Sequence, residues 1–248
     1  MRKIWAIGDL HLSFGVREKD MGLLNPDWAG YTTKLEIFWK ENVSPQDLVL
    51  IPGDISWAMK IEDAAIDLQW IDSLPGTKVM IKGNHDYWWG SLSKIIPHLP
   101  PSIHLIQNNA FHLEEIAIGG ARLWDTDEYS FSKFVDFKEN PRAKAKDPVQ
   151  DDLQEKIFLR ELERLRLSLK AMNKEAKIKI CMTHYPPISA DLQESRASKI
   201  FEEFGIEVVV FGHLHSLKKG LPMFGKKNNI EYALTSADFL DFRLLQIR

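Results

Sequence analysis

The sequence predicts a fold of the α/β (α+β) class. Two observations support this class: short apolar segments that each end in a small or polar cluster, and amphipathic segments of helical period between them. The apolar segments are residues 3–7, 48–51, 78–81, 178–182 and 208–211. Continuous apolar runs of this length, bounded by glycine and proline, are typical of strands buried on both faces of a sheet.

Three segments between these strands have the periodicity of amphipathic helices. Residues 61–71 place apolar side chains at i, i+3, i+4 and i+7, and a Pro-Gly pair follows the end. Residues 153–172 predict a longer helix whose outer face is rich in Glu, Lys and Arg, which is more typical of a solvated face than of a partner surface. Residues 194–204 predict a third helix, which Gly205 ends. Strands that alternate with helices indicate the α/β class.

Four further apolar segments predict hairpins, and therefore a mixed rather than a purely parallel sheet. They come in close pairs without a helix between them, residues 103–106 with 116–118 and residues 231–234 with 243–247.

A polar, charged stretch at about residues 125–151 is predicted to be an exposed excursion. Because strand-end signals resume after it, it is not a linker, and residues 1–248 are predicted to form a single domain. Its length and polarity fit a lid over the functional site and fit a merely mobile loop equally well.

Composition and charge exclude several classes of protein. Apolar residues make up 44% and charged residues 27% of the chain, unlike disordered, collagen-like or coiled-coil chains. The net charge of −3 argues against long nucleic acid as a partner, since such binders carry a basic excess, and concentrated basic residues occur only in 142–146 and 218–227. Cys181 is the only cysteine, so no intrachain disulfide and no cysteine-based zinc site can form. Cys181 is predicted to be a small, buried apolar side chain rather than a reactive thiol.

No segment predicts association with a membrane. The N-terminal apolar run, residues 4–7, is too short for the core of a signal peptide, and no stretch approaches the roughly 18 to 20 apolar residues of a membrane span. We therefore expect a cytoplasmic protein.

Polar side chains gather where the predicted strands end, the edge at which ligands bind in open α/β sheets. The candidate site residues are Asp9, His11, Asp54, Asn84, His85, Asp86, His184, His213 and His215. Carboxylate, imidazole and amide donors together suit Mn, Fe, Co, Ni or Zn better than Ca or Mg. The remaining histidines, His98, His104 and His112, match no motif and are predicted to be structural or on the surface.

As a set, these motifs resemble those of the calcineurin-like metallophosphoesterase superfamily. They are Asp9-x-His11, Gly53-Asp54, Gly83-Asn84-His85-Asp86, His184 and Gly212-His213-x-His215. The segments 51–59 and 83–89 are similar to those of a group of bacterial predicted phosphohydrolases in that superfamily. The resemblance implies two mixed β-sheets packed face to face as a sandwich flanked by helices, a four-layer α/β/β/α arrangement.

The resemblance also implies two divalent metal ions (Mn, Fe, Ni, Co or Zn, with Mn favoured) and a role for each motif residue. The implied ligands are Asp9, His11 and His215 for the first metal, Asn84, His184 and His213 for the second, and Asp54 as the bridge. A hydroxide that bridges the metals would attack phosphorus, and His85 would protonate the leaving oxygen as general acid. We add the hypothesis that the Asp86 carboxylate orients the His85 imidazole.

Two functions from different classes fit this site. The first is a dinuclear-metal-dependent phosphoesterase (phosphohydrolase) that acts on a phosphodiester or a phosphomonoester; the alternative is a non-catalytic metal-binding scaffold or protein-interaction module on the same fold. The complete set of ligands favours the enzyme. The expected partner is a small phosphate ester, a nucleotide included, with no membrane, and the oligomeric state stays open.

The ester class is less clearly indicated than the reaction. No arginine closely follows Asp54 or Asp86, in contrast to the serine/threonine protein phosphatases that resemble this pattern. Few cations near the site favour diesters or small nucleotides slightly over other monoesters. Tryptophans near the motifs (Trp57, Trp88, Trp89 and Trp124) could stack a nucleobase, line a leaving-group pocket or simply pack the rim.

Overall fold

A computed structural model describes residues 2–136, 148–218 and 220–248 of the chain. The middle of the predicted excursion, residues 137–147, lies outside the described residues. The basic segment 142–146 therefore also lies outside them, and the structure does not test whether the excursion forms a lid.

The described strands form two mixed sheets. The first sheet has the order β11 (Leu245–Gln246), β1 (Ile4–Ala6), β2 (Leu48–Ile51), β3 (Thr77–Met80) and β4 (Ile103–Leu105). The second has the order β5 (Phe111–Leu113), β6 (Ile116–Ala121), β7 (Ile178–Thr183), β8 (Val208–Phe211), β10 (Ile230–Leu234) and β9 (Gly225–Lys227). The inner strands of each sheet run parallel, and the antiparallel pairs are β11 with β1, β5 with β6 and β9 with β10.

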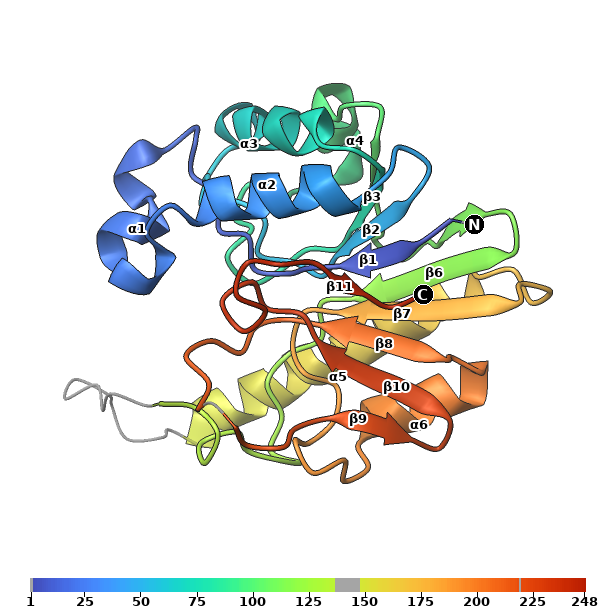
Figure 1. Cartoon of the computed structure of the whole chain (residues 1–248). Helices are drawn as coiled ribbons and strands as arrows, with labels where there is room; N and C mark the ends of the chain where they lie inside the picture. The colour runs from blue at the N-terminus through green and yellow to red at the C-terminus, as the bar shows by residue number, and fades with distance from the viewer. Residues whose placement is uncertain (1, 137–147, 219) are drawn as a thin grey trace.

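Helices cover the outer face of each sheet, so that the layers follow the order α/β/β/α (Figure 1). The helices over the first sheet are α2 (Tyr31–Asn42), α3 (Ile61–Ser73) and α4 (Leu92–Ile95), and those over the second are α5 (Pro148–Lys170) and α6 (Arg196–Phe204). The connection from β1 to α2 contains the short α1 (Met21–Leu24). Within the described ranges, no helix is both long enough and apolar enough to cross a membrane.

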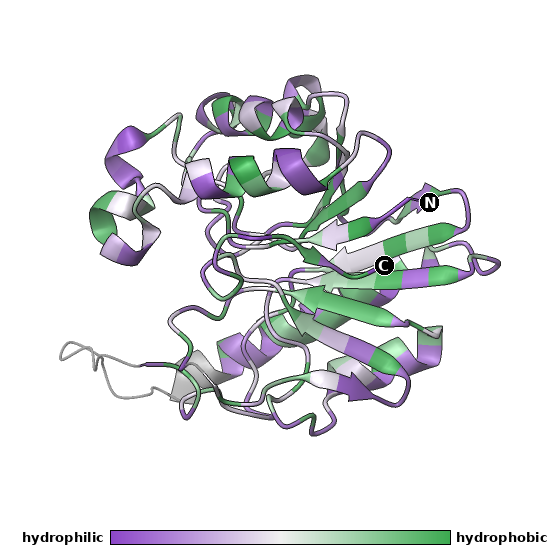
Figure 2. Ribbon diagram, in the orientation of Figure 1, coloured by the Kyte–Doolittle hydropathy of each residue, from purple (hydrophilic) through white to green (hydrophobic). Residues whose placement is uncertain are grey.

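Apolar side chains fill the space between each pair of layers. In β2, Leu48 and Leu50 point into the core between the sheets, whereas Val49 and Ile51 join the core beneath α2 and α3. The side chains of β8 alternate in the same way between the core that separates the sheets and the core beneath α5 and α6. Figure 2 shows the strands of both inner layers largely in the colours of apolar residues. Because both faces of these strands are buried, their sequences are continuous apolar runs.

The predicted hairpins are wrong, although the predicted mixed character of the sheets is confirmed. β4 pairs in parallel with β3 in the first sheet, whereas β6 lies in the second sheet and pairs with β5. β5 is a partly exposed edge strand without the apolar run that would have predicted it. β10 and β11 also lie in different sheets. Segments that follow one another in sequence are thus separated in space, because the chain crosses between sheets after β4 and after β10.

Capping residues set the bounds of α6. The Ser195 hydroxyl accepts a hydrogen bond from the backbone N–H of Ser198, the Ser198 hydroxyl accepts one from the N–H of Ser195, and Gly205 ends the helix at a φ of 66°. The helix therefore starts slightly later than its periodicity predicted. α2 was not predicted, because its buried side chains, Tyr31, Leu35 and Trp39, form only a narrow stripe.

Leu50→Ala tests the packing between the sheets. Leu50 is fully buried, so truncation leaves a cavity and should lower the free energy of unfolding by about 2–5 kcal/mol. Urea denaturation measures this. Leu159→Ala on α5, where the side chain is 45% exposed, is the control and should change stability by no more than about 0.5 kcal/mol. Similar losses in the two variants would contradict the described sheet packing.

Candidate metal centre

The candidate site lies where the carboxyl ends of parallel strands from both sheets meet. β1, β2 and β3 of the first sheet and β7 and β8 of the second end on the same side of the molecule, and the loops that follow carry the predicted site residues (Figure 1). Isolated bridges join Gly8 to Ser236 and Leu12 to Ser56 among these loops. The two sheets thereby bring polar side chains from distant segments to one place.

Four of the predicted ligands have a left-handed backbone conformation. The φ angle is 55° at Asp9, 45° at His11, 51° at Asp54 and 72° at His213. Residues other than glycine adopt this conformation rarely and at an energetic cost, and such residues cluster at functional sites.

Two motif glycines are required by the close approach of carboxylates. A Cβ atom on Gly83 would overlap the Asp54 side chain, and one on Gly212 would overlap the Asp9 side chain. The backbone therefore closes directly behind both carboxylates.

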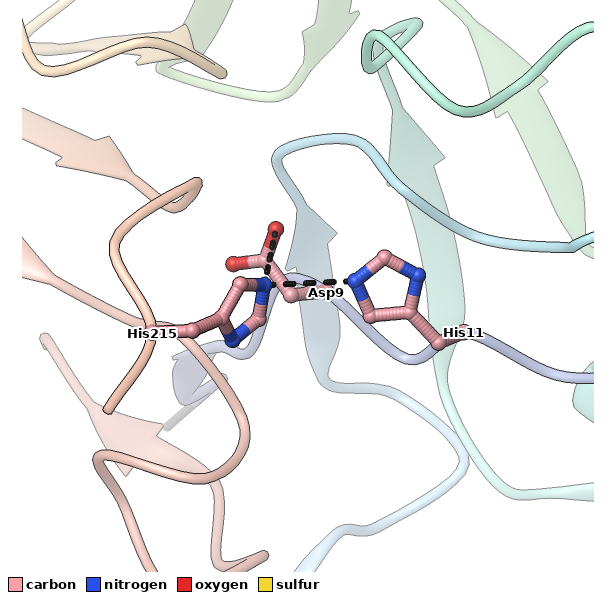
Figure 3. A group of neighbouring side chains, drawn as sticks. All are labelled: Asp9, His11 and His215. Atoms are coloured by element: carbon pink, nitrogen blue, oxygen red, sulfur yellow. Dashed lines mark hydrogen bonds and ion pairs between the residues drawn. The ribbon is translucent and has the colours of Figure 1, made fainter. Parts of the chain in front are cut away.

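Asp9, His11 and His215 come together (Figure 3). Nε2 of His11 lies 3.2 Å from Nε2 of His215, and that atom lies 3.8 Å from Oδ1 of Asp9. One possible ligand atom from each residue falls within 4.8 Å of the others, a spacing that could hold one metal ion. These three residues were predicted to hold the first metal.

Asn84, His184 and His213 form a second group. Oδ1 of Asn84 lies 2.6 Å from Nε2 of His184 and 3.0 Å from Nδ1 of His213. The remaining ring nitrogen of His184, Nδ1, lies 3.0 Å from the Pro52 carbonyl oxygen, which orients the ring so that Nε2 points toward Asn84. These three residues were predicted to hold the second metal.

Asp54 lies between the two groups. Its Oδ2 atom is 3.8 Å from Nε2 of His11 and 3.5 Å from Nε2 of His184. Ligand atoms of Asp9, Asp54 and His184 also fall within 4.8 Å of one another. Asp54 was predicted to bridge the two metals, and its carboxylate lies close to both groups.

Burial dominates the ionisation of these groups. It raises the pKa of Asp9 to about 7 and raises that of Asp54. It lowers the pKa of His184 to about 3, that of His213 to about 2, and that of His11 well below its usual range. The three histidines are therefore neutral, with nitrogen lone pairs available to a cation.

The donor set fits divalent cations. Buried carboxylates are costly unless a positive charge accompanies them, and neutral imidazoles beside them are the ligand form that metals bind. A divalent ion among these groups would satisfy both conditions, which supports the predicted preference for borderline metals such as Mn, Fe, Co, Ni or Zn.

Asp238 is a site residue that the motifs did not predict. Its Oδ1 atom lies 2.9 Å from Nδ1 of His215, and its Oδ2 atom accepts a hydrogen bond from the backbone N–H of Ser216. Burial acts to lower the pKa of His215, but the bond to Asp238 and the charge of Asp9 raise it to about 9. Asp238 thus fixes the ring so that Nε2 faces Asp9 and His11. Asp238 follows the end of β10, just as Asp9 and Asp54 follow their strands, and this position in the sequence could have indicated it as a site residue.

His85 lies beside the two groups of ligands. Its backbone N–H donates a hydrogen bond of 2.8 Å to Oδ1 of Asp54. Its half-buried ring lies 4.6 Å from the Trp57 ring and 5.7 Å from the His11 ring, measured between centroids. The predicted acid is therefore held next to the carboxylate that lies between the groups.

The hypothesis that Asp86 orients the His85 ring is wrong. Asp86 is fully buried, and its Oδ1 atom accepts hydrogen bonds from the backbone N–H groups of Ile55 and Ser56 and from the Trp88 indole. Its Oδ2 atom accepts one from the N–H of Gly83, while Nδ1 of His85 has no hydrogen-bond partner among the described residues. Asp86 instead ties the loop after β2 to the loop after β3.

The residues predicted to be structural lie away from this cluster. His98, His104 and His112 are exposed, and Nε2 of His112 accepts a hydrogen bond from the backbone N–H of Asn173. Cys181 is fully buried, and burial raises its pKa above the usual range, as expected of a packed thiol.

Comparison with known proteins connects this site to a family. A sequence model described as calcineurin-like phosphoesterase matches residues 2–217. The chain belongs to this family. Membership confirms the predicted fold and the predicted enzyme class, a metal-dependent hydrolase of phosphoric esters, and it implies divalent metal cofactors.

Similar proteins add a partial sequence match and two structural likenesses. The Gene 66 protein of Mycobacterium phage D29 is 37% identical over 89 residues, which are 35% of this chain and 41% of that protein. The protein of unknown function AQ665 from Aquifex aeolicus aligns with a TM-score of 0.52 at 14% identity, covering 99% of this chain and 96% of that one. The phosphopantetheinyl hydrolase PptH from Mycobacterium tuberculosis aligns with a TM-score of 0.54 at 12% identity, covering 99% and 95%. At these identities the two structures share the phosphoesterase fold with this chain.

Asp238→Asn tests the orientation of His215. The amide is a weaker acceptor for the imidazole N–H and carries no charge, so we expect the affinity for Mn²⁺ to fall about 10- to 100-fold. Calorimetric titration of the metal-free protein measures this. Asp241→Asn is the matched control, because that carboxylate is 73% exposed and pairs with the exposed Arg243. Equal Mn²⁺ affinity in the two variants would contradict the assigned role.

Asp86→Ala tests the link between the loops. Four buried donors lose their acceptor, so we expect the free energy of unfolding to fall by more than about 3 kcal/mol. Asp86→Asn keeps an oxygen for the three donors at Oδ1 but places an amide nitrogen opposite the N–H of Gly83, so the loss should be smaller. Chemical denaturation measures both. Reduced turnover in Asp86→Asn with unchanged stability would restore a direct role beside His85.

Proposed function

We propose that this phosphoesterase hydrolyses small phosphomonoesters or phosphodiesters with two divalent metal ions, Mn²⁺ favoured, held in the cluster described above. The position of Asp54 supports this most strongly, because one carboxylate oxygen lies within 3.8 Å of ring nitrogens from both groups. The proposed ligands are Asp9, His11 and His215 for one ion, Asn84, His184 and His213 for the other, and Asp54 for both.

The chain supplies the geometry, and the metals supply electrophilic chemistry. When bound, the ions offset the charge of the phosphate and lower the pKa of a water molecule, which becomes the nucleophile. Asp9 and Asp54 hold their positions through backbone donors, since Asp9 accepts hydrogen bonds of 3.1 and 2.9 Å from the N–H of His213 and Asp54 accepts one from the N–H of His85. These bonds fix the carboxylates before any substrate arrives.

His85 is the proposed general acid. When the bond between phosphorus and the ester oxygen breaks, the electron pair stays on that oxygen, and a proton from the imidazole neutralises it. The neighbouring Trp57 ring and the backbone bond to Asp54 hold the imidazole in place for this transfer.

The cations near the site bear on the choice between monoesters and diesters. Arg122 follows β6 and its carbonyl accepts hydrogen bonds from the N–H groups of His184 and Tyr185, but its guanidinium group pairs with Glu161 at 3.3 Å. An engaged guanidinium supports the slight preference for diesters or small nucleotides. Manganese as the natural metal, a cytoplasmic location and a single domain stay predictions.

The test uses metal-stripped protein reconstituted with Mn²⁺ and two substrates, p-nitrophenyl phosphate and bis-p-nitrophenyl phosphate. We expect metal-dependent turnover that Asp54→Asn abolishes, and the ratio of the two rates separates monoesterase from diesterase activity. His85→Ala should bind the same amount of metal and lose about 10²- to 10⁴-fold in kcat. His98→Ala, at an exposed histidine outside the cluster, is the control.

Two outcomes would contradict the proposal. No turnover with Mn²⁺, Ni²⁺, Co²⁺ or Zn²⁺, despite bound metal, would favour the scaffold alternative. An unchanged kcat of His85→Ala on an ester with a poor leaving group would show that His85 is not the general acid, because departure of such a group depends most on protonation.

A further inference from the structure

Three consecutive aromatic residues follow Asp86, and the structure separates their roles. Trp88 and Trp89 are 4% and 2% exposed, and their indole N–H groups donate to Asp86 and to Gln107. These two rings therefore pack the core beneath the loop. Tyr87, in contrast, is 55% exposed. Packing does not account for an aromatic ring at position 87.

The exposed ring of Tyr87 lies at the proposed general acid. Its centroid is 6.1 Å from that of His85, at an interplanar angle of 77°, and its backbone N–H donates to the His85 carbonyl. Trp57 lies against the same imidazole at 4.6 Å and stacks on His11 at 4.8 Å with an interplanar angle of 22°. The His85 ring thus has an aromatic neighbour from the loop after β2 and another from its own loop.

The chemistry of hydrolysis determines which part of a substrate reaches these rings. Oxygen from water forms a bond to phosphorus, the bond from phosphorus to the ester oxygen breaks, and the ester oxygen takes the proton of His85. The ester oxygen must therefore lie at His85 in the reacting complex. The organic group bonded to it then lies beside His85, next to the rings of Trp57 and Tyr87.

We propose that Trp57 and Tyr87 form a binding platform for an aromatic leaving group, so that this enzyme prefers phosphate esters that carry an aromatic ring on the alcohol side. This rests on the proposed function, because it takes His85 as the acid. An aromatic ring stacks on such side chains irrespective of hydrogen-bonding pattern. The ring can belong to an aryl alcohol or to a nucleobase.

Binding of two phosphonates to the Mn²⁺-loaded protein tests the platform without turnover. Phenylphosphonate and methylphosphonate carry the same anionic group and differ in the ring. By calorimetry we expect the wild type to bind phenylphosphonate about 3- to 10-fold more tightly, and Tyr87→Ala to bring this ratio close to one. Tyr87→Phe, which retains the ring, should retain the preference. Leu167→Ala removes a side chain that is 52% exposed on α5 and is the matched control.

Kinetics then distinguish the two sources of the ring. Phenyl phosphate is compared with ethyl phosphate, and adenosine monophosphate with ribose 5-phosphate, as KM and kcat separately. A rise in KM of about 3- to 10-fold in Tyr87→Ala, confined to the ring-bearing member of one pair, identifies an aryl group or a nucleobase as the occupant.

The experiments distinguish failure of the binding platform from failure of the proposed function. Equal loss of affinity for both phosphonates in Tyr87→Ala, or an unchanged ratio, would overturn the platform even if the enzyme hydrolyses esters well. Absence of hydrolysis by wild-type protein with bound metal would overturn the proposed function, and the phosphonate ratio would still report on the two rings.

Discussion

The burial of two carboxylates at the junction of two sheets is the constraint on which the rest of the site depends. Asp9 and Asp54 are 0% and 1% exposed, and buried charge is costly unless hydrogen bonds and a counter-charge accompany it. The backbone N–H of His213, from the second sheet, donates to Asp9 of the first, and the N–H of His85 donates to Asp54. Satisfying the carboxylates therefore also sets the position of the loops that carry the imidazoles.

The same burial explains why the site is suited to cations. Neutral imidazoles surround the carboxylates because charged ones would be poorly solvated, and His215 differs because Asp238 and Asp9 offset its burial. A divalent ion bound here would add positive charge beside the buried carboxylates, so metal binding and folding would be energetically linked at this place. The buried carboxylates and imidazoles thus belong to the junction between the sheets as much as the apolar core beside them does.

The sequence alone predicted the strand ends well and the strand neighbours poorly. Apolar runs such as 48–51 are unambiguous because both faces of the strand are buried, and the polar residues that follow them fall at one edge for the same reason. The pairing of β5 with β6 and the placement of β11 beside β1 depend on where the chain crosses between sheets, which local patterns do not encode. Asp86 was assigned to the site by its neighbour in sequence, whereas its hydrogen bonds point into the loops behind it. Asp238 was missed because no motif includes it.

The backbone lies directly against the two carboxylates at Gly83 and Gly212. The site therefore has two parts that should accept amino-acid substitutions at different rates during evolution. Behind Asp9 and Asp54 no side chain can be added without displacing a carboxylate, so that half is closed to variation. The exposed side chains of Met59 and Tyr87, by contrast, contribute little to the packing of the fold, so we expect substitutions there to leave Asp9 and Asp54 in place. A fold built in this way can acquire a new substrate through a few surface substitutions while its metal chemistry stays the same.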